Sequence, residues 1–178
     1  MNTKLGFTAT LLAAGFLATP ALAADRDDYK AFSQSSTSLT QAIQAAEKAQ
    51  GGQARAVDAE FDHDDGKSIY EIKVMSGDQV MTYHIDAVSG QSTKSEEQGA
   101  LADFLGVNKV DPVKLTSAQT TLAQAIGVAE QNTNGKAIEA EVDEDTGGIH
   151  YEVTVLVGDE AREVEVDGST GQILKAER

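Results

Sequence analysis

The chain contains one segment twice, and this internal duplication restricts the folds that are open to it. Residues 59–91 align with residues 140–172 at a constant shift of 81, with 13 of 33 positions identical and no gap. Upstream, residues 38–47 align with residues 121–130 at a shift of 83, with six of ten positions identical. Self-similarity of this kind is typical of a repeated structural unit. We therefore expect two copies of one small unit, with the two-residue difference placed in a connection between elements.

Each copy is predicted to begin with an amphipathic helix. Apolar residues recur in both copies at positions i, i+3, i+4 and i+7, which is the spacing of one helix face. They are Leu39, Ala42, Ile43 and Ala46 in the first copy and Leu122, Ala125, Ile126 and Ala129 in the second. Ser38 with Gln41, and Thr121 with Gln124, are the residue pairs of a capping box. Both helices should therefore start at the same point of the repeat.

Three strands are predicted to follow each helix. Apolar residues alternate with polar ones, which indicates one buried face and one solvated face of an antiparallel sheet. The apolar sets are Val57, Ala59, Phe61; Tyr70, Ile72, Val74; Met81, Tyr83, Ile85; and then Ile138, Ala140, Val142; Tyr151, Val153, Val155; Val164, Val166. Gly77-Asp78 and Gly158-Asp159 fit two-residue hairpin turns with glycine at the first central position. The short tails 91–93 and 172–174 are candidates for an edge strand.

The predicted fold class is α+β, with two repeated αβββ modules at residues 38–93 and 120–178. Each module is one helix packed on a small antiparallel β-sheet. A single module of about 60 residues would be marginally stable, so we expect the two to share a core or a sheet. Residues 94–119 form a linker, with a short helix expected over Glu96–Leu105. Residues 24–37 are expected to be a flexible arm.

The first 23 residues have the pattern of a secretory signal peptide. Lys4 precedes the uncharged run Leu5–Ala18, Pro20 ends that run, and Ala21-Leu22-Ala23 offers small residues before a cut. Fourteen residues are too few to span a bilayer of about 30 Å as a helix. We expect cleavage after Ala23, a periplasmic or secreted mature protein and no membrane insertion after cleavage. The alternative is an N-terminal anchor that is not cleaved.

The charge and the cysteine count exclude several function classes. The net charge is −15, and removal of Lys4 with the signal peptide makes it −16. This charge repels phosphate backbones and anionic lipid, so we expect no nucleic-acid partner. A basic protein surface or a divalent cation would be attracted, although the charge also fits a simple role in solubility. The chain has no cysteine, which excludes disulfides, thiolate metal sites and cysteine nucleophiles.

Several repeated motifs resemble the PepSY family. Tyr70-Glu71-Ile72 and Tyr151-Glu152-Val153 open the second strand of each copy, and residues 86–91 and 167–172 close the third with Asp-x-x-Ser/Thr-Gly-Gln. The resemblance covers residues 38–93 and 121–176. It implies modules that occur in propeptides of secreted metallopeptidases, where they inhibit or chaperone the enzyme, and in other exported or membrane-anchored bacterial proteins. It implies no catalytic residues. The Asp and Gly of the closing motif also have a structural explanation as a side-chain-capped turn.

Two acidic loops are the candidate metal sites. Their carboxylates are Asp62, Asp64 and Asp65 in the first copy and Asp143 and Asp145 in the second. Calcium prefers several hard oxygen ligands around a tight turn, which alternating aspartates before a glycine can provide. The glycine stands fifth rather than sixth, and the glutamate of an EF-hand loop is missing. Solvated hairpin loops are therefore the favoured interpretation, and weak calcium sites are the alternative.

The histidines and tyrosines give no strong site pattern. His63, His84 and His150 have no counterpart in the other copy and no i, i+4 spacing, so we expect surface histidines rather than zinc ligands. Tyr70 and Tyr151 occupy equivalent inward positions, which predicts core aromatics whose hydroxyls reach the edge of the core.

The sequence as a whole favours a non-enzymatic periplasmic protein that binds and regulates another protein. No Gly-x-Ser-x-Gly elbow or other catalytic pattern is present. The expected partner is another exported or membrane protein, with a peptidase or the extracellular part of a sensor as candidates. The alternative is a calcium- or cation-responsive protein that uses the acidic hairpin loops. Calcium apart, no cofactor is expected.

Overall fold

The computed structural model describes residues 26–51, 54–77, 79–100 and 110–177. The predicted signal peptide and its cleavage site lie outside these residues. The helices are α1 (Arg26–Ser33), α2 (Leu39–Gln50), α4 (Pro112–Ser117) and α5 (Leu122–Thr133). The strands of the first copy are β1 (Arg55–Asp64), β2 (Lys67–Ser76), β3 (Gln79–Asp86) and β4 (Ser92–Ala100). Those of the second copy are β5 (Lys136–Asp145), β6 (Gly148–Val157), β7 (Glu160–Asp167) and β8 (Ile173–Ala176).

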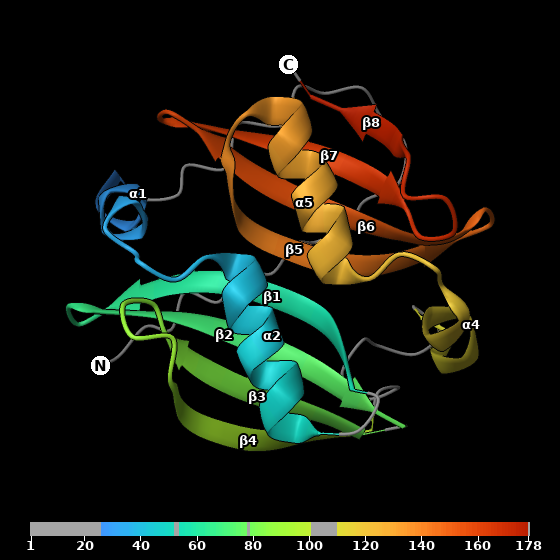
Figure 1. Cartoon of the computed structure of the whole chain (residues 1–178), viewed down its shortest axis with the longest axis horizontal. Coiled ribbons are helices and arrows are strands. Elements are labelled where there is room, and N and C mark those ends of the chain that lie inside the picture. The colour runs from blue at the N-terminus through green and yellow to red at the C-terminus, as the bar shows by residue number, and fades with distance from the viewer. Residues whose placement is uncertain (1–25, 52–53, 78, 101–109, 178) are drawn as a thin grey trace, which may run out of the picture.

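The strands form one sheet, and this corrects the expectation of two small sheets. The eight strands are ordered β4-β3-β2-β1-β5-β6-β7-β8, and the pairs within and between the copies are antiparallel (Figure 1). The first strand of each copy pairs with the first strand of the other. This pairing removes one open edge from each copy and satisfies its backbone hydrogen-bonding groups. The expected sharing of a sheet is therefore correct, and the α+β class is confirmed.

The junction between the copies has an approximate two-fold relationship. Ala59 of β1 lies directly opposite Ala140 of β5, and these two residues are equivalent at the shift of 81. The neighbouring cross-strand pairs are Asp58–Glu141 and Glu60–Glu139. The two copies thus meet through the same surface on each, as the subunits of a two-fold dimer do. A consequence is that acidic positions of one copy face acidic positions of the other.

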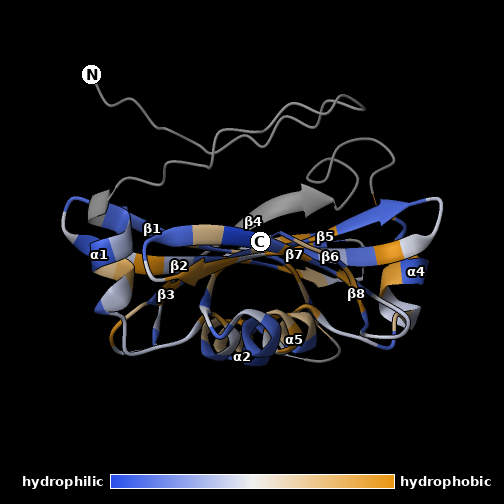
Figure 2. Ribbon diagram, turned by 90° about the horizontal axis from the view of Figure 1, so that it is seen from above, coloured by the Kyte–Doolittle hydropathy of each residue, from blue (hydrophilic) through white to orange (hydrophobic). Residues whose placement is uncertain are grey.

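Both long helices cover the same face of the sheet (Figure 2). Each helix begins with the predicted capping box, at Ser38 in α2 and at Thr121 in α5. The predicted apolar stripe of each helix is buried against the strands and belongs to one continuous core. The first strand of each copy has a bulge at an equivalent residue, Val57 in β1 and Ile138 in β5. The duplication is therefore preserved in the details of each copy.

The predicted flexible arm contains a helix instead. Helix α1 contains Phe32, which is 6% exposed and whose ring lies 5.2 Å from that of Phe61. The ring of Phe61 in turn lies 5.6 Å from that of Tyr70, with both pairs edge to face. Burial of an aromatic ring stabilises the segment that carries it. This tertiary contact accounts for the order that the local composition of the arm does not predict.

The linker prediction was wrong in its secondary structure. Residues 92–100 form β4, which pairs with β3, so the first five residues of the expected helix Glu96–Leu105 lie in a strand. The remaining part of that segment falls outside the described residues, and the linker's helix is α4 at Pro112–Ser117. The open edge of β3 offers a full row of backbone partners, which outweighs a weak local helical pattern. With β8 at the other edge, each copy has a fourth strand, which begins in the tails 91–93 and 172–174 that were candidates for an edge strand.

The predicted hairpin turns and tyrosine positions are confirmed where the structure describes them. Val157 pairs with Glu160 across a two-residue turn, in which Gly158 has φ 66°. The Tyr70 hydroxyl donates a hydrogen bond to the carbonyl oxygen of Thr37 at 2.7 Å. In the second copy, the Tyr151 hydroxyl donates to the Thr120 carbonyl oxygen at 2.6 Å. Each tyrosine therefore ties the segment before a helix to the second strand of its copy.

We expect Tyr151→Phe to lower the free energy of unfolding by about 1–3 kcal/mol, because the buried Thr120 carbonyl loses its donor. The ring itself stays packed, so the loss reports the hydrogen bond rather than a cavity. Equilibrium urea unfolding measures the difference. Tyr70→Phe is the matched variant in the first copy and should give a loss of similar size. Unchanged stability in both variants would show that these hydroxyls do not tie the segments together.

Candidate functional site

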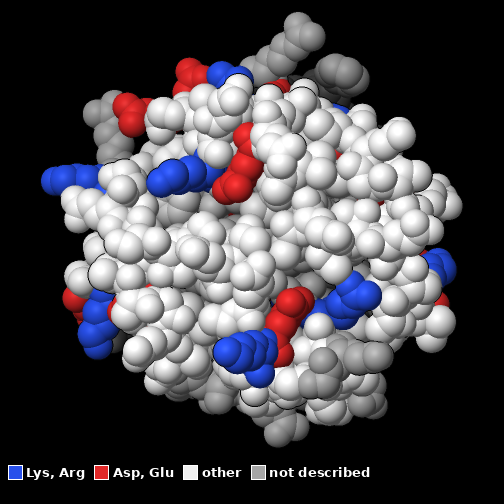
Figure 3. All heavy atoms as spheres, viewed as in Figure 1, with Lys and Arg blue, Asp and Glu red and all other residues white. Residues whose placement is uncertain are grey.

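The face of the sheet opposite the helices is rich in carboxylates. Alternation along each strand points the apolar residues toward the helices and their polar neighbours to the other face. We call this second face the acidic strand face. Its carboxylates are Asp58, Glu60, Glu71, Glu139, Glu141, Asp143, Glu152, Glu163 and Glu165. By contrast, the helix side in Figure 3 is mostly uncharged, with a few acidic side chains beside basic ones.

The strand register brings these carboxylates into rows that cross the junction of the two copies. Glu71 lies opposite Glu60, which lies opposite Glu139. A second row runs through Lys73, Asp58, Glu141, Glu152 and Glu165 on five strands. The ammonium of Lys73 lies 3.1 Å from a carboxylate oxygen of Asp58 and 3.7 Å from one of Glu71. Like charges directly opposite each other destabilise a sheet, so this arrangement is not explained by packing.

The proximity of these groups shifts their pKa values. Burial, followed by the neighbouring charge of Asp58, raises the pKa of Glu60 to about 7. Burial and the charge of Glu141 raise the pKa of Glu139 to about 7 as well. Burial also raises the pKa of Asp58, although the nearby Lys73 ammonium opposes that shift. At neutral pH Glu60 and Glu139 are therefore less completely ionised than ordinary glutamates.

The predicted calcium ligands lie at the ends of two hairpins and are not gathered into one site. Asp62, Asp64 and Asp65 are exposed, with Asp65 in the turn itself at φ 50°. Asp145 is also exposed, and its carboxylate accepts a hydrogen bond from the backbone of the turn residue Gly147 at 2.6 Å. Among the described residues, only Asp143 of the five candidates belongs to a group of three potential metal ligands.

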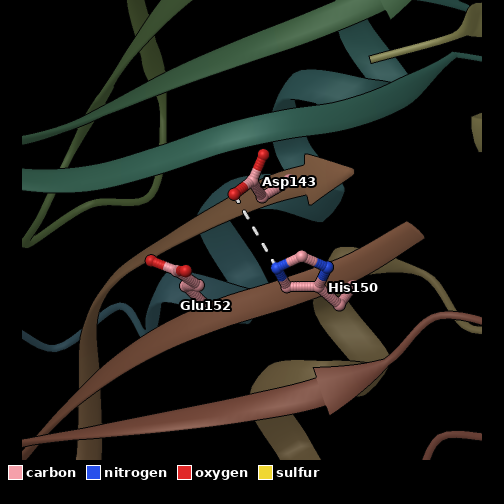
Figure 4. A group of neighbouring side chains, drawn as sticks. All are labelled: Asp143, His150 and Glu152. Atoms are coloured by element: carbon pink, nitrogen blue, oxygen red, sulfur yellow. Dashed lines mark ion pairs between the residues drawn. The ribbon is translucent and has the colours of Figure 1, made fainter. Parts of the chain in front are cut away.

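That group joins Asp143 to His150 and Glu152 (Figure 4). One ligand atom of each residue lies within 4.8 Å of the others. Asp143 of β5 lies directly opposite His150 of β6, and Glu152 follows two residues later on the same side of β6. Burial and the charge of Glu163 raise the pKa of Glu152 to about 7. A further carboxylate, that of Glu165 in β7, lies 3.7 Å from the Nε2 atom of His150.

The expectation of surface histidines was wrong for His150. Its residue is 6% exposed, and it lies directly between Asp143 of β5 and Asp167 of β7 in the strand register. The other two histidines are only partly buried: His63 bonds to the Ser68 hydroxyl at 2.8 Å, and His84 lies 3.5 Å from Glu71. The sequence did contain a signal for the group. His150 and Glu152 are two apart in a strand, and the hairpin register places Asp143 beside them.

The Asp-x-x-Ser/Thr-Gly motifs have the structural role that was expected. The carboxylate of Asp86 accepts hydrogen bonds from the backbone N–H groups of Val88 and Ser89, at 3.2 and 2.7 Å. Asp167 accepts from Ser169 and Thr170 in the same way, at 3.1 and 2.6 Å. These bonds, with those from the Ser89 and Thr170 hydroxyls, hold the pKa of both aspartates below its ordinary value. The motif closes a turn.

The fold and this face define an α+β protein made of two tandem copies, without a recognisable catalytic arrangement among the described residues. A family model described as "Peptidase propeptide and YPEB domain", PepSY, matches residues 38–96 and 121–177. The chain therefore belongs to the PepSY family and contains two copies of its domain. The family is of propeptide type and indicates a non-catalytic module.

Two further comparisons bear on the chain. No curated protein matches it. A crystal structure of a candidate lipoprotein from Clostridium difficile 630 is similar with a TM-score of 0.46 and 21% identity, over 81% of this chain and 94% of the other. Within the described part of the chain, no helix is long and apolar enough to cross a membrane.

Proposed function

We propose that the mature protein is a non-enzymatic periplasmic binding protein whose acidic strand face docks a cationic segment of another exported or membrane protein. The observation that carries this proposal is the accumulation of carboxylates across the junction of the two copies. Glu60, Glu139 and the residues around them are held close together although their repulsion destabilises the fold. A bound cationic segment would remove that repulsion.

The accessibility of the face supports the proposal. The side chains of Glu71, Asp143 and Glu165 are 31%, 28% and 24% exposed, so their carboxylates can contact a partner. A surface whose charges have one sign also associates faster with a partner of opposite charge. Added salt weakens this effect. We therefore favour binding through the face over addition of a partner strand at a sheet edge.

The strand order also argues against addition of a partner strand at an edge of the sheet. Strand β1 of the first copy and strand β5 of the second pair with each other, so neither is an open edge. One remaining edge is β8, which has four residues and carries Lys175, and a short strand with lysine is a common protection against strand addition. We propose a secreted peptidase as the partner, because the family description names peptidase propeptides. The extracellular part of a sensor is the second candidate.

The test is crosslinking in periplasmic extract, with the captured protein identified and its association rate then measured with the purified components. We expect the rate to fall with salt and to fall again in the triple variant Glu60→Gln/Glu139→Gln/Glu163→Gln. Asp159→Asn, at the exposed turn between β6 and β7, is the matched control and should bind like the wild type. A captured partner that binds the triple variant and the wild type equally well would refute docking on the acidic strand face.

A further inference from the structure

We infer that Asp143, His150 and Glu152, with Glu165 beside the histidine, form a binding site for one divalent transition-metal ion, of which Zn²⁺ is the representative. The four side chains come from the adjacent strands β5, β6 and β7 and lie on one face of the sheet. This inference concerns the second copy alone and does not depend on the proposed protein-binding function.

The distances suit a small divalent ion. The Nε2 atom of His150 lies 3.7 Å from an oxygen of Asp143 and 3.7 Å from an oxygen of Glu165. Tetrahedral zinc with bonds of about 2.0–2.2 Å places its ligand atoms about 3.4 Å apart. The ligand atoms of Asp143, His150 and Glu152 lie within 4.8 Å of one another, so these three side chains need to approach by roughly 1 Å to reach the separations around a bound ion.

The environment of His150 is the second, independent observation. Its side chain is 8% exposed and points among carboxylates, yet the separations of 3.7 Å exceed hydrogen-bonding distance. Both carboxylates, those of Asp143 and Glu165, are ion-pair partners of the ring, so Nε2 already faces oxygens that could share a bound ion. An ion coordinated by Nε2 would lie among the same oxygens.

The ligand chemistry selects the class of ion. One imidazole nitrogen with carboxylate oxygens is a donor set that suits zinc and its first-row neighbours. Calcium instead takes six to eight oxygen ligands and gains little from imidazole. The site therefore differs in ion and in position from the calcium loops that the sequence suggested, and shares only Asp143 with them.

The first copy provides an internal control. The positions equivalent to Asp143, His150, Glu152 and Glu165 are Asp62, Ile69, Glu71 and His84. The central imidazole is replaced by isoleucine, and the histidine of this copy lies instead on the third strand, 3.5 Å from Glu71. Among the described residues, no group of three ligands converges in the first copy. We expect one metal ion per chain.

The test is calorimetric titration of the untagged mature protein with ZnCl₂ at moderate salt. We expect saturation at one ion per chain and a higher melting temperature with Zn²⁺ than with chelator, because the ion binds the native state. His150→Gln should weaken binding at least about tenfold, since loss of outer-sphere partners alone has effects of that size. His84→Gln is the matched variant in the first copy and should bind like the wild type. Glu152→Gln provides a second ligand substitution, and circular dichroism verifies that each variant is folded.

The outcomes separate a built site from general attraction to an acidic surface. Saturable binding that is lost in folded His150→Gln and in Glu152→Gln, but kept in His84→Gln, supports the site. No saturable binding would overturn it. Weak binding of several ions that is equal in all variants, or that an equal concentration of CaCl₂ abolishes, would also overturn it.

Discussion

Leu122→Ala is expected to lower the free energy of unfolding by about 2–5 kcal/mol, while the whole chain still unfolds in a single transition. Leu122 is 2% exposed and belongs to the core beneath α5, so its truncation leaves a cavity between that helix and the sheet. The loss should spread to the first copy because β1 and β5 pair in one sheet, and both copies contribute to one apolar core. Calorimetry and urea unfolding followed by circular dichroism measure the effect.

Leu39→Ala is the matched variant, because Leu39 occupies the equivalent position in α2 and is 1% exposed. We expect a destabilisation of similar size, again in a single transition. If the copies were independent domains, each variant would instead melt in two steps, with the intact copy retaining the wild-type transition. Two separated steps would therefore contradict the shared core.

The features predicted correctly are those that short stretches of sequence determine. The capping boxes at Ser38 and Thr121 act within one helical turn, and the Gly158-Asp159 hairpin needs only its own residues. The arrangement of the copies depends on contacts between residues 81 positions apart, such as Ala59 opposite Ala140. Alternation shows that a strand has an apolar face, but it does not show which other strand completes its edge. For that reason one sheet of eight strands was not distinguished from two small ones.

The sequence predicted which types of residue form the candidate site, but not how they are arranged. The acidic residues were recognised. Of the hairpin aspartates only Asp65 lies in a turn, whereas Asp62, Asp64, Asp143 and Asp145 belong to strands β1 and β5. What was missed is the burial of one side chain: His150 was taken for a surface residue, whereas it is 6% exposed although it lies on the acidic strand face. Comparison of the copies also misled the interpretation, because it treats an unrepeated histidine as insignificant. A site that arose in only one copy after duplication leaves no repeat signal.

The protein is expected to melt at a higher temperature near pH 5 than near pH 8. The pKa values of Glu60 and Glu139 are about 7 in the folded protein, against an ordinary value of 4.5. Between these two values the folded state holds protons that the unfolded state has released, so each rise in pH destabilises the folded state. The stability that these groups contribute is fully present below about 4.5 and is lost as the pH rises through about 7. The lowered pKa values of Asp86 and Asp167 act in the opposite sense, but only in more acidic solution.

The double variant Glu60→Gln/Glu139→Gln should remove much of this pH dependence and melt higher than the wild type near pH 8. Glutamine stays neutral, and the two amides can replace the repulsion across the β1–β5 pair with hydrogen bonds. Some pH dependence of the melting temperature should persist, because the pKa of Glu152 is also raised to about 7. Glu160→Gln is the control at the exposed end of β7, with a side chain that is 76% exposed, and it should leave the pH profile unchanged. Thermal melts by circular dichroism at both pH values decide the matter. A double variant with the wild-type pH profile would show that the junction carboxylates do not set the pH dependence of stability.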